Sequence, residues 1–257
     1  MNVLITGASG GLGRALAGEC ARRGYNMLLT DLKTDNLLAL KHGLECQYPV
    51  SITVKACDLT ADQNVDDLLM FTDQHNLRFD MLLNVAGIDH EGGFLSIERQ
   101  KILDIVNLDI IATLRITHGL LERRRPGKPF YILFVSSLAS LCPMPFKATY
   151  AASKRFLLDF SIALNRELQD QKVHVMALCP AGLATTHEAL QGIAAQGFWG
   201  QITTCHIEIM VRMTISHLLC GRHVYIPGTV NRILSFFGKL VPPAAASALV
   251  YSRWQKS

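Results

Sequence analysis

The stretch VLITGASGGLGRAL, residues 3–16, places four glycines between an apolar run and a helix-like segment. Glycine clusters of this kind are common wherever a chain reverses sharply. Here the glycines at positions 7, 11 and 13 follow the order G-x-x-x-G-x-G rather than the familiar G-x-G-x-x-G. By itself the stretch is either a phosphate-binding loop or a tight turn, and the remainder of the chain has to distinguish the two.

The composition is that of a large folded domain. The chain has 257 residues, 49% of them hydrophobic, and a formal net charge of +4 with scattered Lys and Arg residues. It can bury a large core, and its charge pattern gives no indication of a nucleic-acid partner. Seven cysteines without a C-x-x-C pair, and a first predicted strand that leaves no room for a signal peptide, favour a reducing cytoplasm.

The sequence gives little support for a membrane-spanning protein or a metalloprotein. We identify no apolar run long enough to span a bilayer. The nine histidines have no metal-ligand spacing, so we expect no metal site.

Short segments rich in Val, Ile and Leu alternate with amphipathic segments along the whole chain. The predicted strands are residues 2–6, 26–30, 51–56, 80–87, 130–137, 173–179 and 223–228. This alternation predicts a single α/β domain over residues 1–257, with a doubly wound, Rossmann-like parallel sheet of about seven strands and helices on both faces. Ligands bind such a sheet at the carboxyl ends of its strands, where the glycine-rich stretch would lie.

In that fold each glycine acquires a role. Gly7 would end the first strand, Gly11 would let the backbone approach a ligand, and Gly13 would let the following helix pack closely against the sheet. The N-terminus of that helix would face a pyrophosphate, because its unpaired N–H groups and its dipole favour an anion.

Asp31 follows the second predicted strand, where a dinucleotide fold contacts the adenosine ribose. A carboxylate there accepts hydrogen bonds from the ribose hydroxyls and repels a 2'-phosphate, which favours NAD over NADP. Lys33 lies close enough in sequence to soften that repulsion. The alternative is a solvated aspartate that caps the next helix.

Tyr150 and Lys154 are four residues apart at the start of a predicted helix and therefore share one face. Alone, this pair could be an aromatic ring packed on a lysine stem. Two upstream residues strengthen the catalytic interpretation: Ser137, thirteen residues before Tyr150 at the end of the fifth predicted strand, and Asn107 in the preceding helix.

Together these motifs resemble the short-chain dehydrogenase/reductase family in its compact single-domain branch, and the resemblance covers most of the chain. It implies a catalytic tetrad of Asn107, Ser137, Tyr150 and Lys154. It also implies a cofactor site formed by Gly7, Ser9, Gly10, Gly11, Leu12, Gly13, Asp31, Asp58, Leu59, Asn84, Ala86, Gly87, Tyr150, Lys154, Pro180, Gly182 and Thr185. Gly10 stands where many NADP-using relatives have a basic residue, which agrees with NAD as the cofactor.

Two departures from the family pattern concern the cofactor site. Val85 replaces the second Asn of the family's N-N-A-G motif, and Ala181 is inserted between Pro180 and Gly182. The insertion predicts a slightly different backbone around the nicotinamide amide.

The chemistry that these residues suit is hydride transfer at a carbon that bears a hydroxyl or carbonyl oxygen. A phenol has a pKa of about 10, so we expect the Lys154 ammonium to lower the pKa of Tyr150 towards neutrality. Ser137 would hold the substrate oxygen, and by resemblance Asn107 would fix a water that links Lys154 to solvent. Ser136 is the rival serine, but neighbours on a strand point to opposite faces, and the spacing to Tyr150 favours Ser137.

The substrate is expected to be a hydrophobic small molecule. Residues 183–210 correspond to the family's variable substrate loop and include Phe198 and Trp199, and residues 229–257 form an apolar C-terminal extension. A steroid or bile acid is the candidate substrate. The alternatives are an acyl-carrier-linked 3-oxoacyl reductase, which Asp31 disfavours because such reductases generally use NADPH, and a non-catalytic NAD-binding scaffold or sensor.

The extension carries an apolar cluster that something must cover. We expect it to pack within a homodimer or homotetramer, or to wall the apolar side of the substrate pocket. Contact with a membrane surface is a less favoured alternative, based on Arg232, Lys239 and Arg253 near the apolar residues.

Overall fold

The protein, described from a computed structural model over residues 1–181, 206–238 and 241–254, is built on a parallel sheet of seven strands. Their order is β3-β2-β1-β4-β5-β6-β7. The strands are β1 Asn2–Thr6, β2 Asn26–Asp31, β3 Ile52–Ala56, β4 Met81–Asn84, β5 Phe130–Val135, β6 Val173–Leu178 and β7 Val224–Tyr225. The predicted Rossmann-like sheet is therefore confirmed.

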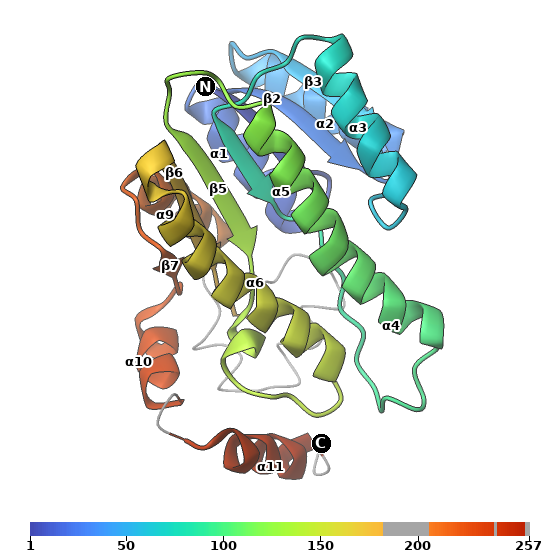
Figure 1. Cartoon of the computed structure of the whole chain (residues 1–257), viewed down its shortest axis with the longest axis vertical. Helices are drawn as coiled ribbons and strands as arrows, with labels where there is room; N and C mark the ends of the chain where they lie inside the picture. Colours follow the sequence, from blue (N-terminus) through green and yellow to red (C-terminus); the bar gives the residue numbers. More distant parts are fainter. Residues whose placement is uncertain (182–205, 239–240, 255–257) are drawn as a thin grey trace.

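Helices cover both faces of the sheet (Figure 1). They are α1 Gly11–Arg22, α2 Thr34–Gln47, α3 Asp62–Gln74, α4 Arg99–Val106, α5 Thr113–Glu122, α6 Ala148–Glu167, α9 Ile207–Leu219, α10 Thr229–Gly238 and α11 Pro243–Trp254. Short helical turns are η1 Asn107–Ala112, which is a π-helix, η2 Leu138–Leu141 and η3 Gln169–Gln171. One buried core packs under α1, α2 and α9, and the other under α3, α5 and α6.

The central strands β1 and β4 are apolar between their end residues because both of their faces are buried. In β1, Val3 and Ile5 belong to one core and Leu4 to the other, and all three are fully buried. This is why the sequence shows short continuous apolar runs rather than an alternation of apolar and polar residues.

The strand order reverses between β1 and β4. The chain moves outward from β1 to β2 and β3, then returns to place β4 on the other side of β1. Thr6 at the end of β1 is in register with Thr30 of β2 and Asn84 of β4, so their carboxyl ends lie together. Such a reversal opens a crevice for a ligand at that edge of the sheet.

The observed strands are shorter than predicted mainly where loops of the candidate site begin. The strand expected over residues 80–87 ends at Asn84, and the one expected over 130–137 ends at Val135. The residues that follow them turn away from the sheet.

The last predicted strand contains only Val224–Tyr225, and the C-terminal extension that follows it forms two helices. The second of them, α11, begins at Pro243, where the fixed φ of proline and its missing N–H suit the first turn of a helix. Most of the predicted substrate loop, including Thr185, Phe198 and Trp199, lies outside the described residues, as does the predicted cofactor residue Gly182.

Candidate active site and cofactor cleft

The glycine-rich stretch forms a tight loop that tolerates no side chain at two positions. Gly7 has a φ of +64°, and a Cβ there would lie 2.7 Å from the backbone N and Cα of Ala86. A Cβ at Gly13 would lie 2.0 Å from the carbonyl oxygen of Gly7. Gly13 therefore permits helix α1 to pack against the loop itself, where we had expected contact with the sheet.

This loop borders a cavity of about 550 Å³ at the strand reversal. The other walls are Asp31 after β2, Asp58 and Leu59 after β3, and Ala86 and Gly87 after β4. Residues predicted from four separate motifs thus meet around one cleft. A cradle of backbone that a Cβ would fill, at the N-terminus of a helix, fits the pyrophosphate of a dinucleotide.

Asp31 connects the second strand to the glycine loop. Its carboxylate accepts hydrogen bonds from the backbone N–H groups of Ser9 at 2.8 Å and Leu32 at 2.7 Å. Helix α2 begins at Thr34 after Lys33, so the alternative that Asp31 caps this helix is wrong. The carboxylate instead lines the cleft, at the position expected for ribose recognition.

The segment after β4 is fastened to the end of β1. The Thr6 hydroxyl accepts hydrogen bonds from the N–H groups of Val85 and Ala86 at 3.1 and 3.2 Å. Asn84 is buried and donates to the Thr117 hydroxyl, and it does not line the cleft. Its Oδ1 is buried with no hydrogen-bond partner among the described residues.

Three of the four predicted catalytic residues lie together. The Ser137 and Tyr150 side chains are hydrogen-bonded, and the Lys154 Nζ lies 5.4 Å from the centroid of the Tyr150 ring. Ser136 is fully buried and donates its hydroxyl proton to the Lys154 carbonyl at 2.7 Å. Its hydroxyl is thus committed to the backbone of α6, which supports the choice of Ser137.

The loop after β5 is hydrogen-bonded to the segment that follows β6. The Pro180 carbonyl accepts a hydrogen bond from the N–H of Leu138 at 2.9 Å, next to Ser137. Pro180 therefore lies beside the predicted catalytic serine, although its expected contact with a cofactor is not tested by this bond.

Tyr150 has a pKa raised to about 12. Burial is the main cause, and the carboxylates of Asp89 and Asp109 raise the pKa further, whereas the hydrogen bond with Ser137 lowers it. We had expected Lys154 to bring this pKa down towards neutrality, and that expectation is wrong for this structure. The main physical reason is the burial of the phenol, and the nearby Lys154 ammonium is itself paired with a carboxylate.

That carboxylate belongs to Asp109, which sequence reasoning missed. Asp109 is fully buried, and its Oδ2 lies 3.0 Å from the Lys154 Nζ. Asn107, the residue predicted for this part of the site, makes no hydrogen bond to Ser137, Tyr150 or Lys154 in the described part of the chain. Asn107 begins the π-helical turn in which Asp109 lies two residues later.

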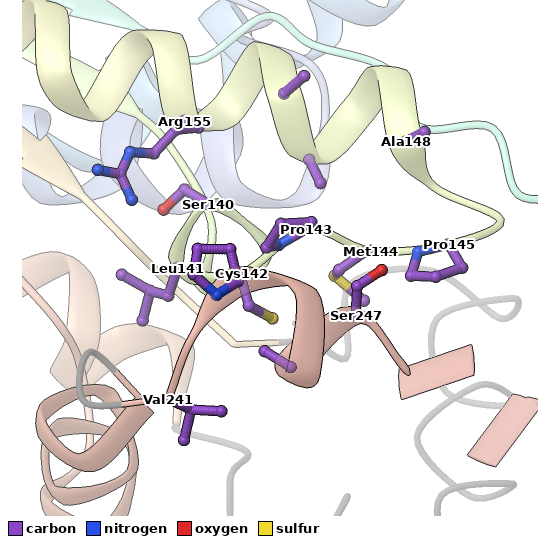
Figure 2. Close-up of a pocket in the computed structure, with 14 residues that line it drawn as sticks. Ser140, Leu141, Cys142, Pro143, Met144, Pro145, Ala148, Arg155, Val241 and Ser247 are labelled. Carbon is purple, nitrogen blue, oxygen red and sulfur yellow. The ribbon is translucent and has the colours of Figure 1, made fainter. Parts of the chain in front are cut away.

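A second cavity, of about 740 Å³, borders the loop that follows Ser137 (Figure 2). Figure 2 shows Leu141, Cys142 and Pro143 between helix α6 and the C-terminal segment that carries Val241 and Ser247. Its walls are mainly apolar. Ser137 and Tyr150 do not line this cavity. Ser140 does line it, and the Ser140 hydroxyl donates a hydrogen bond to the Ser137 carbonyl at 2.6 Å.

A parallel sheet with a glycine cradle at its strand reversal, beside a Ser, Tyr and Lys cluster, is an arrangement typical of dinucleotide-dependent oxidoreductases. Comparison with known families agrees. The short chain dehydrogenase family matches residues 1–192, and the chain belongs to this family.

Curated relatives include very-long-chain 3-oxoacyl-CoA reductases of fungi. The protein from Phaeosphaeria nodorum is 32% identical over 188 residues, which are 68% of this chain and 52% of the relative. The protein from Coccidioides immitis is 30% identical over 222 residues, which are 84% of this chain and 60% of the relative. The chain thus spans only about half to three fifths of the length of these relatives.

Solved structures show the same fold. A short-chain dehydrogenase from Sphingobium yanoikuyae in complex with NADPH is 26% identical, with a TM-score of 0.80 over 92% of each chain. A bulky-bulky ketone specific alcohol dehydrogenase from Comamonas testosteroni is 25% identical, with a TM-score of 0.78 over 93% of this chain and 91% of that one. Within residues 1–181, 206–238 and 241–254, no helix combines the length and apolarity needed to cross a bilayer.

Proposed function

We propose that this protein interconverts a carbonyl and a hydroxyl group on a substrate with an extended apolar part, with a nicotinamide dinucleotide held in the 550 Å³ cleft. The observation that carries the proposal is the cluster of Ser137, Tyr150 and Lys154 on the loop after β5 and the first turns of α6. A bound nicotinamide supplies or accepts the hydride. The protein must then manage the substrate oxygen and its proton.

Tyr150 is the proton donor for reduction. With a pKa of about 12 its hydroxyl is protonated at neutral pH and can transfer its proton to a carbonyl oxygen as that oxygen gains charge. Ser137 donates a hydrogen bond to the same oxygen and stabilises the developing charge. Lys154, whose Nζ lies 5.4 Å from the Tyr150 ring centroid, would bind the nicotinamide ribose of the cofactor.

For the cofactor we propose a preference for NAD(H). The Asp31 carboxylate lines the cleft, and Gly10 offers no cation for a 2'-phosphate. The Sphingobium neighbour was solved with NADPH, so the preference has to be measured with both cofactors.

For the substrate, a long-chain 3-oxoacyl thioester is favoured over the steroid or bile acid that we first considered. The names of the relatives outweigh the earlier argument against this class, which was that such reductases generally use NADPH whereas Asp31 favours NAD(H). The curated relatives of 30–34% identity bear the name very-long-chain 3-oxoacyl-CoA reductase. The 740 Å³ apolar cavity beside the loop after Ser137 is within the size range of small-molecule sites and could hold an aliphatic chain.

The experiment for the reaction is Tyr150→Phe, measured as oxidation of NADH or NADPH with 3-oxoacyl thioesters and bulky ketones. Turnover should be lost while cofactor binding, followed by fluorescence titration, persists. Tyr131→Phe is the matched control, because Tyr131 stacks on His174 away from the cleft and loses the same atom. Full turnover of Tyr150→Phe would refute the mechanism. A non-catalytic scaffold or sensor would bind the cofactor but show no turnover that depends on Tyr150.

The experiment for the apolar cavity compares two residues of α11. Ala246 lines the cavity, whereas Ala248 is exposed and does not. Ala246→Phe should raise KM for long acyl chains about tenfold and leave short chains unaffected, since it fills part of the cavity. Ala248→Phe should change neither. Equal KM values for long chains in wild type and Ala246→Phe would exclude the cavity as the binding site of the chain.

A further inference from the structure

Asp109 and Lys154 form an ion pair that is shielded from water. Asp109 is fully buried and the Lys154 side chain is only 5% exposed, with 3.0 Å between Oδ2 and Nζ. Ser153 donates a hydrogen bond to the same oxygen at 2.8 Å, and the N–H of Ile88 donates to Oδ1 at 3.1 Å. Removing either charge from such a pair leaves the other uncompensated in a medium of low polarity.

Two features of the chain create this pair. The π-helical turn Asn107–Ala112 lies between α4 and α5 and contains Asp109. π-Turns are rare and occur mostly where a side chain has a function. Gly87, directly before Ile88, leaves room for the pair, because a Cβ there would lie 2.8 Å from the Lys154 Nζ and 2.9 Å from the Asp109 Oδ1.

We propose that Asp109 is a positioning residue that neutralises Lys154 and keeps Tyr150 protonated near neutral pH, so that the site accepts the proton of an alcohol only at alkaline pH. This inference rests on the proposed function, because it concerns the proton step of the same reaction.

The charges around the phenol support it. Lys147 Nζ lies 5.8 Å from the Tyr150 ring centroid, as Lys154 Nζ does at 5.4 Å, and these are the two cations that the described structure places over this ring. Lys147 is paired with Asp89 and Glu91, and Lys154 with Asp109. Each ammonium near the phenol is thus matched by a carboxylate, and a tyrosinate gains little from either.

The two directions of the reaction need opposite protonation states of Tyr150. In reduction, hydride reaches the carbonyl carbon, the phenol O–H bond breaks, and its proton goes to the carbonyl oxygen. In oxidation, the phenolate takes the proton from the alcohol as hydride leaves the carbon. A phenol with a pKa of about 12 is almost wholly protonated at neutral pH. It is therefore in the form that reduction requires and not in the form that oxidation requires.

The test is Asp109→Asn, which removes the charge but keeps the size of the side chain and a possible acceptor for the Ile88 N–H. With Lys154 no longer neutralised, the pKa of Tyr150 should fall by about 1 unit or more. The pH at which alcohol oxidation reaches half of its maximum should fall equally, and the rate of oxidation at neutral pH should rise about tenfold. Asp159→Asn is the control, since Asp159 is an exposed carboxylate on α6, the helix that carries Tyr150 and Lys154, and is paired with Arg155.

A direct readout does not depend on turnover. Carbon NMR of tyrosine labelled at Cζ, with the Tyr150 signal assigned by its absence in Tyr150→Phe, follows the phenol through its titration. A Tyr150 signal that titrates at the same pH in wild type and Asp109→Asn overturns the inference. Absence of turnover with every substrate, together with a shifted titration, would instead refute only the proposed function.

A measurement on the unaltered protein covers the case in which Asp109→Asn does not fold. Oxidation by wild type should keep rising with pH beyond about pH 9, because the phenol is still mostly protonated there. A plateau reached below about pH 8 would show that the phenol ionises easily, and would overturn the inference.

Discussion

Replacement of Gly13 by Ala tests the cofactor cradle most directly. The new Cβ would lie 2.0 Å from the Gly7 carbonyl oxygen and 2.8 and 2.9 Å from the Cα and carbonyl carbon of Ala8. All three are backbone atoms of the loop, so no side chain can rotate away, and either the loop or helix α1 must shift. Overpacking of this kind costs about 1–3 kcal/mol.

The expected loss in cofactor affinity follows from that magnitude. If the strain is relieved by moving the loop out of its binding geometry, about 1.4–2.8 kcal/mol corresponds to a tenfold to hundredfold weaker Kd. Titration of NADH and NADPH by fluorescence gives Kd, and urea unfolding gives the free energy of unfolding. We expect Kd to rise and the free energy of unfolding to fall.

Gly18→Ala is the matched control on the same helix. Among the described residues outside the helix backbone, nothing lies within 4 Å of a Cβ at this position. Alanine in a helix is more favourable than glycine by about 0.5–1 kcal/mol, so this variant should be slightly more stable and bind cofactor as wild type does. If Gly13→Ala matched Gly18→Ala in both stability and Kd, the steric reasoning about the loop would be refuted.

Two further predictions concern charge. Asp31→Asn removes the repulsion towards a 2'-phosphate while keeping an acceptor, so the ratio of kcat/KM for NADPH to that for NADH should rise about tenfold or more, and an unchanged ratio would remove Asp31 from cofactor choice. Burial alone would raise the pKa of Glu19, but hydrogen bonds from Arg22 and Arg23 outweigh it and lower the pKa. A lowered pKa stabilises the fold above the ordinary carboxyl pKa and loses that effect as the pH falls, so Glu19→Gln should unfold more easily by about 1–3 kcal/mol at neutral pH, with the difference from wild type shrinking below about pH 4 in urea titrations. A difference that persisted in acid would contradict this assignment.

Much of the site could be predicted because its signals are local. The apolar run of β1, the glycines at 7 and 13, and Asp31 at the end of β2 each follow from backbone geometry or from their place after a strand. The order of strand and helix along the chain then brings these segments to one edge of a parallel sheet. The sequence could therefore predict the fold and most of the cofactor cleft.

Other features depended on contacts between segments far apart in the sequence. Tyr150 and Lys154 could be found by their spacing, but the pKa of Tyr150 depends on burial and on carboxylates from two other segments. The pairing of Asp109 with Lys154 depended on which residues of a π-helical turn point inward. A helical periodicity does not show such a turn, because the turn changes the angle between successive side chains.

What the sequence alone determined, then, is the set of local features: the strands, the glycine loop, Asp31 after the second strand, and the Ser, Tyr and Lys residues. Only the tertiary structure decided their electrostatics, because the fold buries Asp109 against Lys154 and Tyr150 beside both. Charge interactions act through space and strengthen when water is excluded, so they follow from the packing of the chain and not from the order of its residues.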